Sequence, residues 1–107
     1  MPGFVAATEA LQKKGVDSIA CISVNDPFVM GAWAKDQGTD EKVMMLADGN
    51  GEFTQAMGLT MDGSRVGLGT RSQRYAMIVQ DGVIKELLVE KPGAFEVSTA
   101  ENVLKHL

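Results

Sequence analysis

The sequence has only one cysteine, one histidine, one tryptophan and one tyrosine in 107 residues. The single cysteine, Cys21, excludes an internal disulfide and a cysteine-based zinc site, and it favours a reducing compartment inside the cell, the cytoplasm. One histidine, His106, cannot build a metal site by itself. We therefore expect neither a metal nor another cofactor.

The chain also lacks an excess of basic residues and a long apolar run. Lysine and arginine number 10 against 14 acidic residues, and the formal net charge is −4. A nucleic-acid partner requires a clustered basic surface, so none is expected. The apolar runs are far too short to span a membrane, and the N-terminus has no basic segment followed by an apolar core. We therefore expect no membrane partner and no signal peptide.

The residues that are present predict a globular α/β domain. The sequence is 45% hydrophobic and 22% charged, which is typical of a folded protein, and its length predicts one domain over residues 1–107. The uncharged run at 18–24 predicts a strand buried on both faces, as in a parallel sheet. Asn25 or Asp26 caps the helix that follows, with Pro27 at its first position. The apolar residues at helical spacing in that helix are Phe28, Val29, Ala32 and Trp33.

The remaining patterns extend the order of elements to α-β-α-β-(α)-β-β-α. Residues 58–73 contain four glycines and no clear period, which predicts a mobile or functional loop. The Asp81-Gly82 pair predicts a tight hairpin between the last two strands. The segment 98–101 (STAE) predicts a capping box before the closing helix. The other expected elements are helices at 4–14, 27–37 and 52–57 and strands at 43–47, 74–80 and 83–90.

Four segments of the sequence are distinctive when taken together: PGFV at 2–5, KGVDSIACISVNDPFVMGAW at 14–33, KVMMLADGNGEFTQAMGL at 42–59 and GLGTRSQRYAMIVQDGVIKELLVE at 67–90. These segments resemble the type II (atypical) peroxiredoxins, a branch of the redoxin, thioredoxin-like family. The resemblance implies a thioredoxin-like fold and a thiol peroxidase that reduces hydrogen peroxide and alkyl hydroperoxides in cell redox homeostasis. It also implies glutaredoxin with glutathione, or thioredoxin, as the reductant.

The sequence departs from this family at the nucleophile. The family has a P-x-x-x-T-x-x-C loop that carries the peroxidatic cysteine, and this sequence has no counterpart of it. Among the family's catalytic residues, only the arginine that holds the thiolate and the peroxide maps here, onto Arg74. The nearby Arg71 is interpreted as a loop or interface residue. Cys21 is interpreted as a buried apolar residue, with the alternative that it serves as a substitute thiol. We expect no efficient peroxidase activity from these 107 residues alone.

The resemblance further implies a truncated domain without its N-terminal strands and without the central strand before the cysteine helix. That strand would lie between the strands at 18–24 and 74–80, so two inner edges would lack a partner. The two halves would then pair directly, a second copy would supply the partner, or the chain would be a fragment that needs its complement. A homodimer or larger self-association is expected, and the interface residues that the resemblance implies are Phe28, Trp33, Gly67 and Arg71.

Three functions therefore stay open from the sequence. The first is that of a peroxiredoxin-family thiol peroxidase. The second is a non-catalytic truncated form that acts as a dimerisation or interaction module with itself or with a full-length relative. The third is a generic thioredoxin-fold module with a lost function.

Overall fold

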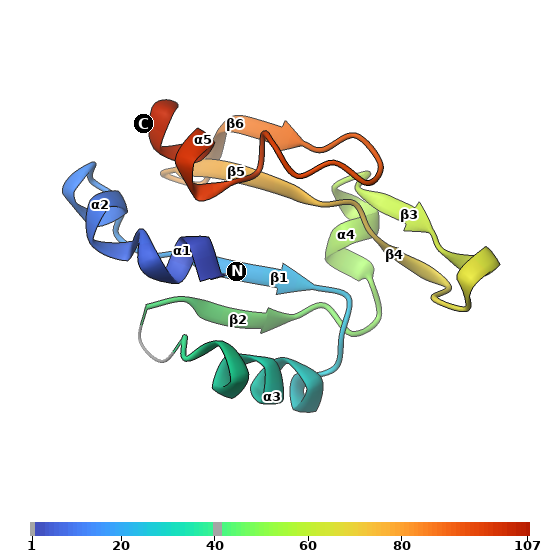
Figure 1. The fold of residues 1–107 in the computed structure, drawn as a ribbon. Helices are drawn as coiled ribbons and strands as arrows, with labels where there is room; N and C mark the ends of the chain where they lie inside the picture. Colours follow the sequence, from blue (N-terminus) through green and yellow to red (C-terminus); the bar gives the residue numbers. More distant parts are fainter. Residues whose placement is uncertain (1, 40–41) are drawn as a thin grey trace. The chain divides into compact units, whose positions relative to one another are not determined.

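The computed structural model describes residues 2–39 and 42–107, and the chain divides into two compact units. One unit contains the described residues up to Asp17 together with Gln73–Leu107, and the other contains Ser18–Ser72. Each unit is described by itself, with the element labels of Figure 1. The expectation of a single domain over 1–107 stays a prediction.

The unit formed by Ser18–Ser72 contains a βαβ segment followed by a short helix and a small hairpin. β1 and β2 pair in parallel, in a register that places Cys21 opposite Met45. β3 and β4 pair antiparallel. The elements are β1 (Ala20–Ser23), α3 (Pro27–Gln37), β2 (Met44–Ala47), α4 (Glu52–Ala56), β3 (Thr60–Asp62), the 3₁₀ helix η1 (Ser64–Val66) and β4 (Thr70–Ser72).

Helix α3 begins and ends where the sequence predicts. The Asp26 carboxylate accepts the backbone N–H of Val29 at 2.8 Å, which satisfies one of the donors that a first helical turn leaves unpaired. Pro27 occupies the first helical position, where no N–H is needed. Gly38 ends the helix in the left-handed conformation, with φ of 62°.

The buried face of α3 differs from the predicted one. Met30 is the buried residue of this helix, at 2% exposure, whereas Phe28 is 89% exposed and Trp33 is half-buried. α3 contacts β2, a strand of only four residues, so a narrow stripe of the helix is covered. The sequence pattern located the helix correctly, but Met30, the residue that the helix buries, is not one of the four apolar residues that showed the helical spacing.

Residues 58–73, predicted as a loop, contain the β3–β4 hairpin. The N–H of Gly63 donates to the carbonyl of Gly69 at 2.6 Å, and Gly67 and Gly69 close the connection with φ of 76° and 65°. A Cβ at Gly63 would lie 2.8 Å from the Cβ of Leu68, so the approach requires glycine. Each strand has three residues, which is too short for an alternating pattern to reveal it.

The other unit contains two short helices, an antiparallel hairpin and the closing helix. The hairpin turns at Asp81 and Gly82, with φ of 52° and 77°, as the sequence predicts. A register shift interrupts the ladder between Ile78 and Val79. The elements are α1 (Pro2–Ala6), α2 (Thr8–Lys13), β5 (Tyr75–Gln80), β6 (Val83–Val89) and α5 (Ala100–Lys105).

The single helix predicted over 4–14 is two helices, α1 and α2, separated at Ala7. The Thr8 hydroxyl donates to the carbonyls of Phe4 and Val5, at 3.1 and 2.9 Å. Such side-chain bonds to the preceding turn compete with the helical ladder and often bend a helix. The predicted capping box is also wrong in register, because Thr99 rather than Ser98 caps α5.

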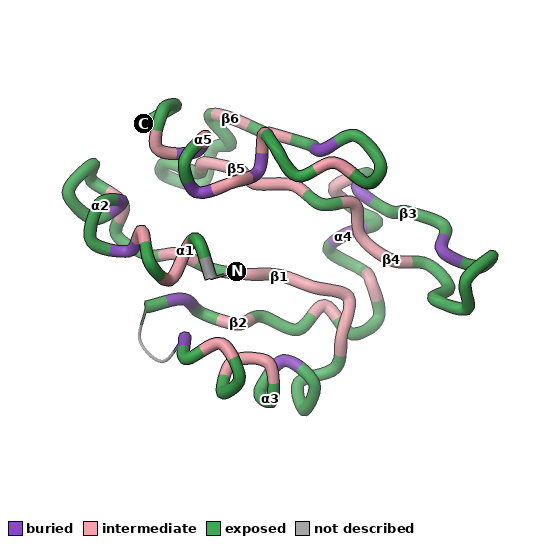
Figure 2. Tube along the Cα trace, in the orientation of Figure 1, coloured by how far each residue is buried: buried purple, intermediate pink, exposed green. Residues whose placement is uncertain are grey.

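Each unit buries its own small set of residues, drawn in purple in Figure 2. β1, predicted to be buried on both faces, is half-buried or exposed along its length, because β2 is its single strand partner among the described residues. The described strands form three separate two-stranded sheets, and the three outcomes expected for the inner edges stay predictions. The buried residues of the unit formed by Ser18–Ser72 are Met30, Thr39, Val43, Thr54, Leu59 and Gly63. Those of the other unit are Thr8, Leu11, Glu90, Ser98, Ala100 and Val103.

Replacing the cap of α3 gives the first testable prediction. Asp26→Ala removes the acceptor for the Val29 N–H, so the free energy of unfolding falls by about 1 kcal/mol, the usual cost of losing an N-cap. Urea denaturation followed by circular dichroism measures it. Asp36→Ala, which removes an exposed carboxylate near the end of the same helix, is the matched control. Equal losses in the two variants would contradict the capping role.

Candidate functional site

Arg74 lies directly before β5 with its side chain exposed. Its carbonyl accepts the backbone N–H of Glu90 at 2.9 Å, which ties it to the residue that follows β6. The guanidinium carbon lies 4.8 Å from the centroid of the Phe95 ring. Among the described residues, no hydrogen bond or ion pair engages the guanidinium, so its five N–H donors are available to a ligand.

The Glu90 carboxylate is a heavily engaged polar group of the same unit. It is 6% exposed, and one of its oxygens accepts three hydrogen bonds. The donors are the N–H of Glu96 at 2.7 Å, the N–H of Ser98 at 2.8 Å and the Ser98 hydroxyl at 2.6 Å. This carboxylate therefore fixes the segment 91–99, which carries Phe95 between β6 and α5.

These bonds also set the charge of Glu90. Burial opposes its charged form, but the Ser98 hydroxyl and the backbone N–H groups of residues 96–98 stabilise the carboxylate more and lower its pKa to about 2. The group is therefore ionised throughout the neutral range. Nothing in the sequence around Glu90 or Phe95 had indicated this arrangement, because the partners lie up to eight residues apart in a segment without a period.

Arg71 is engaged in a different way from Arg74, and it lies in the other unit. Its Nε donates to the carbonyl of Leu68 at 2.8 Å, and its Nη1 donates to the carbonyl of Val24 at 2.6 Å and to Oδ1 of Asn25 at 3.3 Å. These bonds join β4 to the turn that follows β1. Arg71 therefore holds the turn before α3, and most of its donors are used within the unit.

Cys21 lies in β1 and is half-buried. Burial disfavours the thiolate and raises the pKa of the Cys21 thiol above its usual value. A reactive cysteine needs the opposite shift, which a nearby cation or a helix N-terminus produces. The position of Cys21 supports its interpretation as an apolar residue, and its role stays a prediction.

Two of the expected interface residues are exposed, and both lie in the unit formed by Ser18–Ser72. Phe28 is 89% exposed in the first turn of α3, and Gly67 is exposed at the end of η1. Trp33 is half-buried further along α3. The bonds of Arg71 to residues 24 and 25 bring β4 close to the start of α3.

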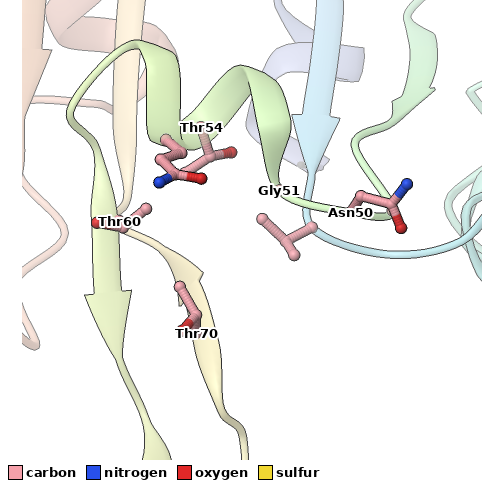
Figure 3. Close-up of a pocket in the computed structure, with 8 residues that line it drawn as sticks. Asn50, Gly51, Thr54, Thr60 and Thr70 are labelled. Carbon is pink, nitrogen blue, oxygen red and sulfur yellow. The ribbon is translucent and has the colours of Figure 1, made fainter.

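A pocket of about 400 Å³, which the sequence had not indicated, lies in this unit. Figure 3 shows the residues that line it. Its lining is polar and uncharged. The hydroxyl of Thr54 is already bound to Asp48 at 2.6 Å, and this bond, with the Thr54 N–H, lowers the pKa of Asp48. The pocket therefore offers hydroxyl and amide groups but no titratable group for catalysis. It is lined by Val24, Gly49, Asn50, Gly51, Thr54, Gln55, Thr60 and Thr70.

The βαβ segment, the C-terminal hairpin and the closing helix define a mixed α/β protein of the thioredoxin-like class. The chain belongs to the redoxin family, whose model, described as Redoxin, matches residues 1–104. Both the fold and the family predicted from the sequence are thereby confirmed.

Individual relatives agree with this assignment. The chain is 55% identical over 109 residues to "Peroxiredoxin-2E, chloroplastic" of Arabidopsis thaliana and 47% identical over 107 residues to peroxiredoxin-2B of the same plant. These alignments cover 100% of this chain but 47% and 66% of those proteins, so the chain spans about half to two thirds of their length. The crystal structure of reduced Prx3 in complex with H₂O₂ from Vibrio vulnificus is 53% identical, with a TM-score of 0.94, and the match covers 99% of this chain and 68% of that one.

No helix in the described part of the chain is long and apolar enough to cross a membrane. The similar peroxiredoxin-2E of Arabidopsis thaliana is named as chloroplastic, and the cytoplasmic location expected from the sequence of this chain stays a prediction.

The pKa of Glu90 predicts how stability depends on pH. Because the folded-state value of about 2 lies below the ordinary 4.5, the carboxylate stabilises the fold fully above 4.5 and loses this effect as the pH falls toward 2. We expect the unfolding free energy to fall over that range, and Glu90→Gln to be less stable at pH 7 and to show a shallower fall. Urea denaturation at several pH values measures both.

Glu96→Gln is the control, since it removes an exposed carboxylate from the same segment while keeping the backbone donor to Glu90. Its pH dependence should match that of the unchanged protein. An equally steep acid dependence in Glu90→Gln would contradict the lowered pKa.

Proposed function

We propose that this chain forms part of a peroxiredoxin-type thiol peroxidase, to which it contributes Arg74 as the residue that binds the peroxide and the thiolate. The observation that carries the proposal is the Arg74 guanidinium, which no hydrogen bond or ion pair engages among the residues that the structure describes. The chain that contains it matches the redoxin model over residues 1–104. Arg71, the other arginine of the segment, is less suited because its donors already bind carbonyls.

The reaction gives this guanidinium a definite task. A cysteine thiolate attacks one peroxide oxygen, the O–O bond breaks, and the sulfur becomes a sulfenic acid. The other oxygen leaves as hydroxide or alkoxide and takes up a proton. A guanidinium that donates to both the thiolate and the departing oxygen stabilises the charge as it moves between them. Glutathione with glutaredoxin, or thioredoxin, then reduces the sulfenic acid to the thiol with release of water.

Cys21 is not suited to be the attacking thiol. It lies in a strand, and burial raises its thiol pKa, so the reactive thiolate is scarce at neutral pH. We infer that the 107 residues by themselves do not turn over peroxide efficiently, and that Arg74 serves a thiol that this sequence does not supply.

A peroxide-consumption assay tests this inference. The purified chain is mixed with hydrogen peroxide or cumene hydroperoxide and with either glutathione and glutaredoxin or thioredoxin and its reductase. We expect the same slow rate for the chain, for Cys21→Ser and for the reductants alone, while Arabidopsis peroxiredoxin-2B, as the positive control, consumes peroxide rapidly. Rapid turnover by the chain that Cys21→Ser abolishes would show that Cys21 is the reacting thiol.

A second candidate function is that of an interaction module that binds a second copy or a full-length relative. The observation that favours it is the exposure of Phe28, at 89%, beside the turn that Arg71 holds in place. Burying a large, exposed aromatic side chain against a partner removes its apolar surface from water, which stabilises the complex.

Mixing the chain with peroxiredoxin-2B and recording native mass spectra tests this second function. We expect homodimers or mixed dimers, and Phe28→Ser should weaken them by roughly 10- to 100-fold, which corresponds to the roughly 1.5–3 kcal/mol of burying one phenylalanine. Phe53→Ser, a matched change at a less exposed aromatic residue of the same unit, should have little effect. Dimers that are absent, or that are equally sensitive to both changes, would exclude Phe28 as the contact.

A further inference from the structure

Arg74 is held by an aromatic ring and not by hydrogen bonds within the described residues. Its guanidinium carbon lies over the Phe95 ring, 4.8 Å from the centroid. The attraction between a cation and an aromatic face uses none of the N–H groups as donors to an acceptor. The contact can therefore restrict the side chain while leaving all five donors to a ligand.

The Phe95 ring is in turn positioned by Glu90. The carboxylate accepts the N–H of Glu96, the residue next to Phe95, at 2.7 Å, and it binds Ser98 through two further donors at 2.8 and 2.6 Å. The N–H of Glu90 donates to the carbonyl of Arg74 at 2.9 Å. One residue thus fixes the backbone on both sides of the contact between Arg74 and Phe95.

We propose that Phe95 is a positioning residue for Arg74 and that Glu90 keeps Phe95 in place. This inference rests on the proposed function, in which Arg74 meets the peroxide and the thiolate. A free arginine side chain has many rotamers, and ordering it into one rotamer when a ligand binds costs conformational entropy, which weakens the binding. A side chain that the ring has already oriented avoids that loss, so the guanidinium is ready for the reacting oxygen.

Nuclear magnetic resonance of the folded chain tests the positioning directly. In the unchanged protein, we expect the ring to shift the Arg74 side-chain protons upfield and the Arg74 Nε to be more ordered than that of Arg65, an exposed arginine of η1. Phe95→Leu should abolish the upfield shift and make the Arg74 Nε as mobile as the Arg65 Nε. Phe95→Tyr keeps an aromatic face and should restore both. Phe28→Leu, the same substitution at an exposed residue of the other unit, should change neither.

Glu90→Gln tests the second half of the proposal. Its amide keeps the size of the side chain but loses the charge that attracts three donors, so the upfield shift of Arg74 should shrink. If Glu90→Gln does not fold, Ser98→Ala, which removes one donor, should shrink the shift to a smaller extent. An Arg74 signal that is unchanged in these variants would overturn the role of Glu90.

The role of Phe95 would be overturned if Arg74 were as disordered as Arg65 in the unchanged protein, or if Phe95→Leu left its shift intact. Peroxide plays no part in these measurements. If the proposed peroxidase function is wrong, the nuclear magnetic resonance signals of Arg74 still report whether Phe95 orders its side chain. If Phe95 does not order Arg74, the peroxide-consumption assay still tests the proposed function.

Discussion

The carboxylate of Glu90 is the constraint on which the C-terminal part of the structure depends. A buried charge is costly unless donors surround it, and here three donors from residues 96–98 meet one carboxylate oxygen. This requirement explains why Thr99 caps α5, because the Ser98 hydroxyl that could have capped the helix is bound to Glu90 instead. It also gives the segment after β6 a defined path and places the Phe95 ring against Arg74.

Two arginines that lie three residues apart serve different purposes in this chain. Arg71 donates to the carbonyls of Leu68 and Val24, and so it joins a short hairpin to the turn before α3. The Arg74 guanidinium lies over the Phe95 ring, and no hydrogen bond or ion pair engages it among the described residues. The difference arises from what surrounds each guanidinium, since the residue type is the same. The proposed function therefore assigns the peroxide-binding role to Arg74, and that role stays a prediction.

The surroundings of Cys21 are those of a packing residue, and its role stays a prediction. Peroxide reduction needs a thiolate beside a cation, whereas Cys21 lies in a half-buried strand whose surroundings favour the neutral thiol. In the proposed function, the chain accordingly supplies the arginine and its support, and the nucleophile comes from elsewhere.

The sequence by itself determined the elements whose signals are local: the Asp26 cap and Gly38 end of α3, the Asp81-Gly82 hairpin, and the family through its distinctive segments. Tertiary structure alone decided that Met30 and not Phe28 is buried, that the glycine-rich segment 58–73 is a hairpin, and that Glu90 joins Phe95 to Arg74. Caps and tight turns follow from the conformational preferences of one or two residues. Burial and long hydrogen-bonded connections depend on which surfaces meet, and no short window of sequence contains that information.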